Sequence, residues 1–512
     1  HDVLGTTFYK RKKDFFRLFE ILVSFPHFSL KTLAKMAEFT KNGQPETSEP
    51  AVSPVPAAQE DGATETKASE EPAPAPKMPS VQPLGREAHC GEALELHGGR
   101  EMVDEARAKE LLEKAKGSYT DFEKVSLTNK SFSVDAAKVL AETFSTYSSV
   151  VDADLSDMIA GRPEEEALQV LETICNSLSQ NSLFKVDLSD NALGEKGILA
   201  CSGVLKEQDS LVSLRLCNNG LSCQAMDTVT DLLLFRKPTR LMSVHFYNNM
   251  SGDGGALALA KLLAECPCLQ DLRFSGTRAL RPGSLAVAKA LQEHKTMVRL
   301  DLADNVFPEE GGLELAKALE DQPSLNWLSL RDCGMEDEAG KAVLSALCAS
   351  APGLRHLDLS GNDLTVECAP LLAQVVLTHP KLTSILYEEN ELESKGAKLL
   401  ANALKREGSV PALTHLQLNS CMIQGKAAVA ITTSLFEMPS LEKLELNGNQ
   451  ISAARLEELR HSLQAMGKLQ VLGDMDENEE DEDEEEEEDE GAGDDEVGDL
   501  AELTTKLNIG AS

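Results

Sequence analysis

Apolar residues recur along the chain in one motif, whose copies begin about 28 residues apart. In the clearest copy, Leu183, Val186 and Leu188 are followed by Asn191, which gives the pattern L-x-x-V-x-L-x-x-N. Apolar residues at every second position predict a short, half-buried strand. We find twelve copies separated by 28 to 33 residues, a regularity that predicts a repeat protein. Their first apolar positions are Phe122, Val150, Leu183, Leu211, Leu241, Leu269, Met297, Leu325, Leu354, Leu382, Leu413 and Leu441.

The second half of each copy has the pattern of a helix. Residues 251–267 (SGDGGALALAKLLAECP) and 308–323 (PEEGGLELAKALEDQP) place Leu and Ala at i, i+3, i+4 and i+7. Such a single apolar stripe packs a helix against strands. A strand and a helix within 28 to 30 residues are typical of the long class of leucine-rich repeat. We therefore predict an α/β leucine-rich-repeat solenoid, or horseshoe, of about twelve repeats, with a parallel sheet on its concave face.

Two columns of residues follow from this repeat. The slot after each strand holds an asparagine in many copies, and a side-chain amide there can satisfy buried backbone groups. Cys333 and Cys421 occupy the same slot, so we interpret both as buried scaffold and not as metal or redox sites. The preceding column should project from the rim of the turns, either as an acidic surface for a basic partner or as a solvated edge. This column holds Asp190, Asn218, Asn248, Asp304, Asp332, Gly361, Glu389 and Gly448.

Four regions are expected along the chain. Residues 1–100 form an N-terminal extension that is largely disordered, because the stretch 41–85 holds nine prolines among small and polar residues. Residues 101–121 form an N-terminal cap, with a helix over 101–116 that turns Leu111, Leu112 and Ala115 toward the first repeat. The leucine-rich-repeat domain covers 122–472, and residues 473–512 form an acidic tail with a terminal amphipathic segment.

The sequences of the two chain ends allow further predictions. The chain begins with His1, and a different composition starts at Met36, so we expect either a fragment or an extended reading frame in which Met36 is the true start. Residues 474–499 contain 19 acidic and no basic residues, a block that repels itself and stays extended. The terminal segment 500–509 places Leu500, Leu503 and Leu507 on one helical face, which suggests a docking role.

Composition and missing motifs disfavour several classes of function. The 512 residues include 49 Lys+Arg and 85 Asp+Glu, and the net charge of -36 disfavours binding of nucleic acid through its phosphates. The sequence has no apolar run of roughly 18 residues, the length of a membrane span. Eleven cysteines without C-x-x-C spacing indicate reduced, intracellular thiols. Phosphate-loop, nucleophile-elbow and metalloprotease motifs are missing, so we expect no cofactor, no metal and no independent active site.

One copy of the repeat carries an unusual turn. After Leu155 the chain reads Gly161-Arg162-Pro163, followed by three glutamates. Gly161 permits a sharp turn, Pro163 suits a helix start, and the glutamates favour the positive end of the helix dipole. A cation has the wrong sign for that end, so Arg162 gains nothing there. From the residues alone, Arg162 is either a surface arginine paired with nearby glutamates or an electrostatic element held ready for a phosphate on a partner.

The strings LSDMIAGRPEEEAL, LSDNALGEKG, FYNNMSGDGGALALA and LDLSGNDLTVECA, with the acidic tail and the terminal segment, closely resemble the Ran GTPase-activating proteins of the plant and green-lineage type. The resemblance covers residues 95–512. It implies stimulation of GTP hydrolysis by Ran, the small GTPase of nuclear transport, so that Ran stays GDP-bound on the cytoplasmic side. The implied partners are Ran-GTP and a Ran-binding protein, the implied state is a monomer, and the GTP and its magnesium would belong to Ran.

The resemblance also assigns residues. The essential arginine of the family corresponds to Arg162, and the asparagine that supports the catalytic machinery of the GTPase corresponds to Asn218, because Asn219 belongs to the scaffold. Asp157, Asp190 and Asn248 are expected near the interface. The resemblance leaves open whether Arg162 enters the nucleotide site or orders the water-positioning glutamine of the partner.

In one respect the chain departs from the plant pattern, because it lacks the Trp-Pro-Pro domain that targets the nuclear envelope. Its single tryptophan, Trp327, lies inside a repeat. We therefore expect residence in the cytoplasm, with the cytoplasmic face of the nuclear envelope as the other location. Two alternatives stay open: a non-catalytic acidic leucine-rich-repeat protein that binds histones or other basic proteins, and a binder similar to ribonuclease inhibitor.

Overall fold

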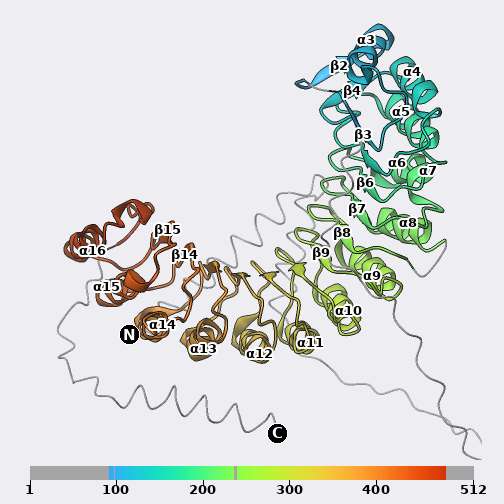
Figure 1. Ribbon diagram of the computed structural model, residues 1–512. Coiled ribbons are helices and arrows are strands. Elements are labelled where there is room, and N and C mark those ends of the chain that lie inside the picture. The colour runs from blue at the N-terminus through green and yellow to red at the C-terminus, as the bar shows by residue number, and fades with distance from the viewer. Residues whose placement is uncertain (1–91, 97, 236–238, 480–512) are drawn as a thin grey trace, which may run out of the picture. The chain divides into compact units, whose positions relative to one another are not determined.

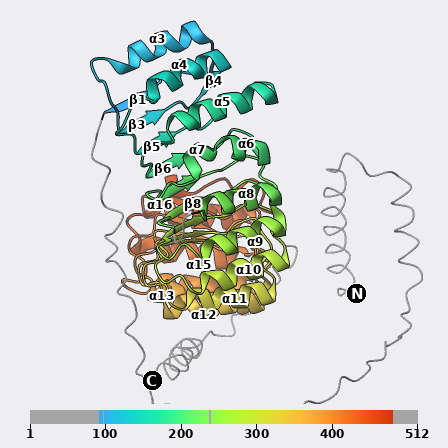
Figure 2. The same cartoon turned by 90° about the vertical axis from the view of Figure 1, so that its right-hand side faces the viewer.

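The computed structural model describes residues 92–96, 98–235 and 239–479. Within these residues, a 13-stranded sheet is formed by short parallel strands that follow one another in chain order. Helices cover the outer side of the sheet, and Figure 1 shows that the described residues form a curve with the strands on its inner side. Figure 2 shows successive helices lying side by side along the outer face. The predicted leucine-rich-repeat solenoid is confirmed.

The strands of this sheet are three residues long. They are β1 (Ala93–Glu95), β3 (Lys124–Ser126), β5 (Asp152–Asp154), β6 (Lys185–Asp187), β7 (Ser213–Arg215), β8 (Ser243–His245), β9 (Asp271–Arg273), β10 (Arg299–Asp301), β11 (Trp327–Ser329), β12 (His356–Asp358), β13 (Ser384–Leu386), β14 (His415–Gln417) and β15 (Lys443–Glu445). A separate parallel pair consists of β2 (Glu101–Val103) and β4 (Lys130–Phe132).

Along the sequence, the helices lie between successive strands. They are α3 (Glu105–Lys116), α4 (Val134–Phe144), α5 (Glu164–Ser177), α6 (Gly194–Ala200), α7 (Ser202–Leu205), α8 (Cys223–Leu233), α9 (Gly252–Leu263), α10 (Arg281–Leu291), α11 (Glu309–Leu319), α12 (Glu336–Ala349), α13 (Ala369–Thr378), α14 (Glu393–Leu404), α15 (Gly425–Ser434) and α16 (Ala453–Ala465). Short 3-10 helices occur at Val366–Cys368, Leu435–Glu437 and Leu469–Val471.

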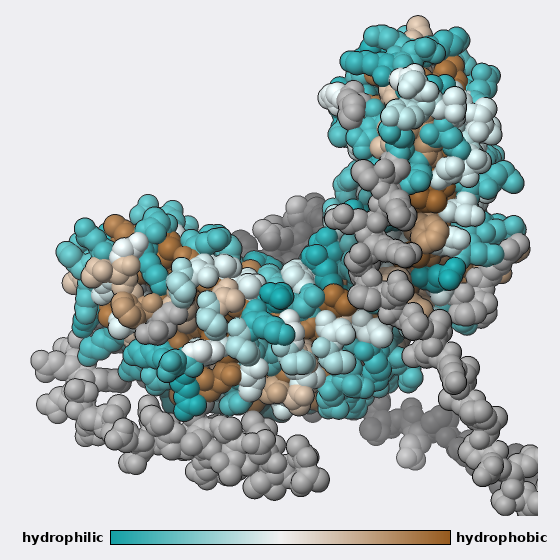
Figure 3. All heavy atoms as spheres, in the orientation of Figure 1, coloured by the Kyte–Doolittle hydropathy of each residue, from teal (hydrophilic) through white to brown (hydrophobic). Residues whose placement is uncertain are grey.

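The curvature follows from the two layers. The strands pair in register, so that Leu300 of β10 lies between Leu272 and Leu328, and all three side chains are buried. Neighbouring strands are about 4.8 Å apart, whereas packed helices need about 8 to 10 Å. Helices therefore force the outer side apart more than strands do, and the sheet becomes the concave face. On the face drawn in Figure 3, hydrophobic residues form separate patches among hydrophilic ones.

The asparagine slot is buried and fully bonded, as predicted. The amide nitrogen of Asn191 donates to the carbonyls of Leu155 at 2.8 Å and Leu188 at 2.9 Å, while its oxygen accepts from the backbone N–H of Met158 at 2.9 Å. Cys421 replaces this donor with its thiol, which donates to the Tyr387 carbonyl at 3.1 Å. Burial raises the pKa of Cys421 to about 12, so its thiol stays protonated and serves the scaffold.

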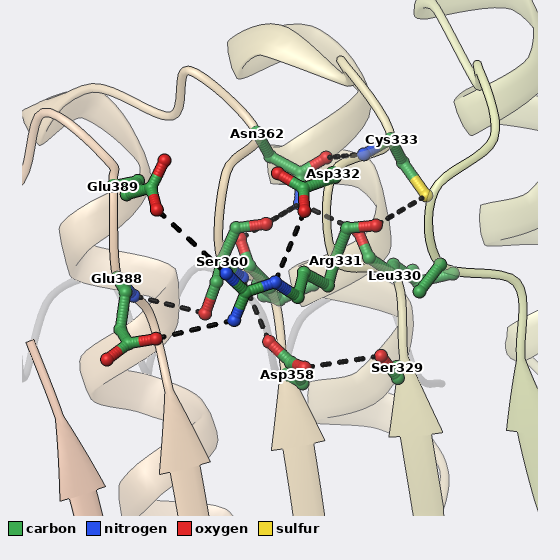
Figure 4. A network of polar contacts seen from close by, with 12 residues as sticks. Ser329, Leu330, Arg331, Asp332, Cys333, Asp358, Ser360, Asn362, Glu388 and Glu389 are labelled. Carbon is green, nitrogen blue, oxygen red and sulfur yellow. Dashed lines mark hydrogen bonds and ion pairs between the residues drawn. The ribbon is translucent and has the colours of Figure 1, made fainter. Parts of the chain in front are cut away.

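The rim column lies one residue earlier and has a left-handed backbone, with φ of 62° at Asp190 and 52° at Asp332. Figure 4 shows that this rim is not simply acidic, because Arg331 lies among three carboxylates. Its guanidinium is 3.2 Å from Asp332, 3.4 Å from Glu388 and 3.9 Å from Glu389. The predicted acidic rim is thus partly neutralised by the protein itself.

The sheet begins earlier than predicted. β1 pairs with β3 in register, which adds a strand ahead of the first predicted repeat, so the boundary placed at residue 100 is too late. Leu94 and Leu96 form the buried apolar pair of this extra copy, but Gly91 fills its first apolar slot and Gly99 its asparagine slot, so the motif escapes the pattern. The cap helix also begins later than predicted, at Glu105, because the Asp104 side chain accepts from the backbone N–H of Arg107.

The C-terminal boundary also differs from the prediction. The backbone of Asn449 donates to Asn478 Oδ1 at 2.9 Å, and the backbone of Glu479 donates to the Asn449 carbonyl at 3.1 Å. Residues up to 479 therefore complete the last repeat, which the prediction ended at 472. The predictions for residues 1–91, including Met36, and for the segment 500–509 lie outside the described residues. No helix in the part of the chain that the structure describes has the length and apolar character to cross a membrane.

Candidate functional site

The turn that carries Arg162 connects β5 to α5. Asp157 has a left-handed backbone with a φ of 46°, and its N–H donates to the Ser189 carbonyl at 3.0 Å. Gly161 has a φ of 76°, a conformation that glycine adopts without strain. Pro163 is the cap residue of α5, and its carbonyl accepts from the N–H of Ala167 at 2.9 Å. The predicted sharp turn and helix start are therefore present.

Arg162 does not project from this turn. Its Nε donates to Ser131 Oγ at 3.1 Å, a terminal nitrogen donates to the Ser131 carbonyl at 2.6 Å, and the other lies 3.1 Å from Glu166. The side chain is only 11% exposed. Ser131 Oγ in turn donates to the Ala160 carbonyl at 2.7 Å, which closes the turn over β4. Arg162 is thus paired with a glutamate, as the first of the two interpretations predicted, but it is largely buried and not on the surface.

Lys130 precedes Ser131 and is fully buried in the asparagine slot of its repeat. Its ammonium donates to the carbonyls of Gly98 at 3.2 Å and Gly99 at 2.8 Å, and lies 3.7 Å from Glu101. A lysine therefore does here what an asparagine does in later repeats, and it binds the turn between β1 and β2 to the strand beneath Arg162.

That turn contributes a second arginine to the site. The guanidinium of Arg100 forms an ion pair with Asp157, which lies 57 residues further along the chain. The Arg100 side chain is 61% exposed, whereas that of Asp157 is 9% exposed. Arg100 consequently covers a nearly buried carboxylate and presents its remaining donors outward.

A groove of about 1070 Å³ brings most of the predicted residues together. Arg162, Asp157, Asp190 and Asn218 all line it. Asn248 is outside the lining, but its amide donates to Asn218 Oδ1 at 3.0 Å, and Asn218 donates to Asp190 Oδ1 at 2.8 Å. The rim residues therefore form a hydrogen-bonded row that leads into the groove.

The groove is lined by charges of both signs. Arg100, Arg162 and Lys196 supply the cations, and Asp157, Glu164, Asp190 and Glu195 supply the anions. Lys196 lies 2.5 Å from Glu164, which links α6 to α5 at the mouth of the groove, and both side chains are exposed. Among the residues that the structure describes, no group of three His, Cys, Asp or Glu could hold a metal ion.

Sequence reasoning missed Arg100, Lys130 and Ser131. One signal could have found them: Leu94 and Leu96 precede Val125 and Leu127 by 31 residues, a spacing within the range of the other repeats. An additional repeat at that position would have placed the Arg100 turn next to the turns of the following copies.

Comparisons with known proteins identify the family. The RAN GTPase-activating protein 2 of Arabidopsis thaliana is 35% identical over 383 residues, which cover 75% of this chain and 69% of that protein. The chain belongs to the RAN GTPase-activating proteins. A second member of this family, RAN GTPase-activating protein 1 of Arabidopsis thaliana, is 38% identical over 120 residues, or 23% of this chain and 22% of that protein.

Two further comparisons concern the repeats of this RAN GTPase-activating protein. The family described as "Leucine Rich repeat" matches residues 352–367. Among solved structures, an internalin of Listeria monocytogenes covers 68% of this chain and 85% of its own, with 13% identity and a TM-score of 0.41. The plant-type resemblance drawn from the sequence is confirmed by the two Arabidopsis relatives.

Proposed function

We propose that this chain stimulates GTP hydrolysis by the small GTPase Ran and so keeps Ran GDP-bound in the cytoplasm. One observation carries the proposal: in a member of this family, Arg162, Asn218 and Asp190 of three neighbouring repeats line one groove. The chain acts as an activator in trans and has no independent active site. GTP and its magnesium belong to Ran, and the chain itself needs no cofactor.

We assign Asn218 the role of orienting the catalytic machinery of the partner. Its side chain is exposed on the rim, where one amide N–H donates to Asp190 and the oxygen accepts from Asn248. An amide has two N–H donors and two acceptor lone pairs, so one of each is left for a partner side chain. A glutamine that positions the attacking water could use both, which would hold the water in line with the phosphate.

Arg162 acts within the protein and does not enter the nucleotide site. All three guanidinium nitrogens face Ser131 or Glu166, and reaching a partner would require breaking those contacts in a largely buried position. Hydrogen bonds that involve a charged group contribute roughly 1.5 to 3 kcal/mol each, so release is costly. We assign Arg162 the role of a positioning residue that fixes the 156–163 turn beside Asn218.

Single-turnover GTP hydrolysis by Ran tests the activity. The wild-type chain should accelerate loss of the γ-phosphate, and Arg162→Ala should reduce the maximal rate constant at least about 100-fold. Circular dichroism should stay near wild type, and the melting temperature should fall by only a few degrees, because the lost hydrogen bonds are confined to one turn. Arg455 offers a matched control, because it also forms a short ion pair, with Glu458 at 2.7 Å, but lies in α16, away from the groove. Arg455→Ala should leave stimulation unchanged. No acceleration by the wild-type chain would refute the proposed function.

Ser131→Ala separates the two roles of Arg162. Ser131 is fully buried and cannot touch Ran, yet its hydroxyl bonds Arg162 and Ala160. If Arg162 positions the turn, Ser131→Ala should lower the maximal rate constant about fivefold, the effect of one lost hydrogen bond. If Arg162 entered the nucleotide site, loosening its anchor would leave the rate constant unchanged or raise it.

The remaining assignments are proposals that rest on the family. The partners are Ran-GTP and a Ran-binding protein, without nucleic acid, and the chain works as a monomer in the cytoplasm or at the cytoplasmic face of the nuclear envelope. The acidic residues 474–499 favour a second candidate, a non-catalytic protein that binds histones. Tight histone binding together with a failure to stimulate Ran would favour that alternative.

A further inference from the structure

The groove has one well-exposed arginine, and it is not the arginine of the Gly-Arg-Pro turn. Arg100 is 61% exposed, against 11% for Arg162. Lys196, the other exposed cation, lies 2.5 Å from Glu164, so its charge is already matched by a neighbour. Asp157 is matched to Arg100 in the same sense, but its nearly buried carboxylate contacts a single terminal nitrogen of the guanidinium.

The backbone on both sides of Arg100 is anchored. On one side, the carbonyls of Gly98 and Gly99 accept from the buried ammonium of Lys130. On the other, β2 pairs with β4 in register from Glu101 onward. An arginine on a turn fixed in this way loses less conformational entropy when it binds than one on a free segment.

We propose that Arg100 is the cation of this groove that contacts an anionic group of GTP-bound Ran, with Asp157 orienting its guanidinium. The proposal rests on the proposed function. A guanidinium has five N–H donors in a planar fork, and two anions can bind it on different edges. Asp157 holds one terminal nitrogen, and the exposed edge fits either a carboxylate of the GTPase or a phosphate of its nucleotide. Arg162 stabilises the 156–163 turn, and Arg100 contacts the anionic group of GTP-bound Ran.

Binding measurements with a matched control test this role. Binding of Ran loaded with a non-hydrolysable GTP analogue is measured for wild type, Arg100→Ala, Arg100→Lys and Arg281→Ala. Arg281 is 66% exposed and lies 2.9 Å from Glu310, so it matches Arg100 in type, exposure and pairing, but it is outside the groove. Arg100→Ala should raise Kd about tenfold, with a smaller loss for Arg100→Lys, and Arg281→Ala should stay within about twofold of wild type.

A double variant excludes a purely structural role. If Arg100 served only to neutralise Asp157, removing both charges in Arg100→Ala/Asp157→Asn would restore binding to the level of Asp157→Asn. If Arg100 contacts Ran, the double variant binds more weakly than Asp157→Asn, by less than the tenfold of Arg100→Ala in wild type, because Asp157 no longer orients the guanidinium. Restored binding in the double variant, or an unchanged Kd for Arg100→Ala, would overturn the proposal.

Single-turnover kinetics identify the anion. A contact with a carboxylate of Ran should raise the half-saturating concentration of Arg100→Ala and leave the maximal rate constant unchanged. A contact with a phosphate, whose charge is redistributed in the transition state, should also lower the maximal rate constant. The readouts are separable from the proposed function: if the wild-type chain binds Ran without hastening hydrolysis, the activity fails while the Kd values still decide the role of Arg100. If the wild-type chain does not bind Ran, both proposals fall.

Discussion

Replacing the buried Lys130 by methionine should loosen the N-terminal repeat and, through it, the Arg162 turn. Methionine keeps an unbranched side chain of similar length but has no donor for the carbonyls of Gly98 and Gly99, which the ammonium now satisfies at 3.2 Å and 2.8 Å. The contact with Glu101 is lost as well. The variant therefore removes the side-chain tie between the Arg100 turn and β4 and leaves the β2–β4 backbone pairing, without opening a cavity.

The magnitude follows from two opposed effects. Each carbonyl left without a partner costs about 1 to 3 kcal/mol. Methionine, however, avoids the desolvation of a buried ammonium, which offsets part of this loss. We expect a net destabilisation of about 2 kcal/mol. In a solenoid each repeat contacts only its neighbours, so this loss should appear as local opening of the terminal repeat and not as global unfolding.

Hydrogen exchange of backbone amides measures that opening directly. A loss of about 2 kcal/mol corresponds to roughly 30-fold faster exchange at Leu96 and Ser133, whose N–H groups bond the carbonyls of Ser126 and Val103. Leu330, which bonds Asp358 in the middle of the arch, should exchange as in wild type. Unchanged exchange at Leu96 and Ser133 would refute the tie assigned to Lys130, and equal acceleration at Leu330 would refute its local character.

Three further predictions follow from the fold. Asn191→Leu should cost about 3 kcal/mol in urea denaturation, because one buried amide satisfies several backbone groups. Burial lowers the pKa of His294, so the folding stability that its neutral ring contributes is fully present above pH 7 and is lost as the pH falls below about 6.5. His294→Gln should therefore reduce the loss of folding stability between pH 7 and pH 5, whereas the same substitution at the exposed His461 should not. Deleting residues 480–512 should leave the melting temperature unchanged but weaken association with Ran more at low than at high salt.

The repeats were predictable from sequence because their stabilisation is periodic. Every strand of the 13-stranded sheet buries its central residue against neighbours of the same kind, and asparagines in the slot of the later repeats donate to equivalent carbonyls. A spacing of 28 to 33 residues therefore carries most of the arrangement. Helix-breaking prolines and first-turn acidic residues add local agreement with the same fold. The extra strand β1 was missed because its copy keeps only Leu94 and Leu96 of the motif.

The contacts of the site were less predictable, because they join residues that no local pattern relates. Sequence reasoning placed Arg162 correctly on a turn with Gly161, but its anchor Ser131 lies 31 residues earlier and looks like any strand serine. Similarly, Arg100 and Asp157 are 57 residues apart, and only the stacking of repeats makes them neighbours. Whether an arginine projects or folds back depends on such partners and not on its own turn.

The departures from the repeat and the candidate site coincide for a physical reason. An asparagine in the slot after the strand fills it with a short amide that bonds backbone carbonyls of its own and the preceding repeat, which leaves nothing to present outward. In the first three repeats the slot holds Gly99, Lys130 and Met158. These residues shift the hydrogen bonding from the slot to the turns: the lysine bonds the Arg100 turn, and the strand beside it anchors Arg162. The groove, whose lining holds cations and anions in nearly equal number, therefore begins where the scaffold lacks its regular asparagine.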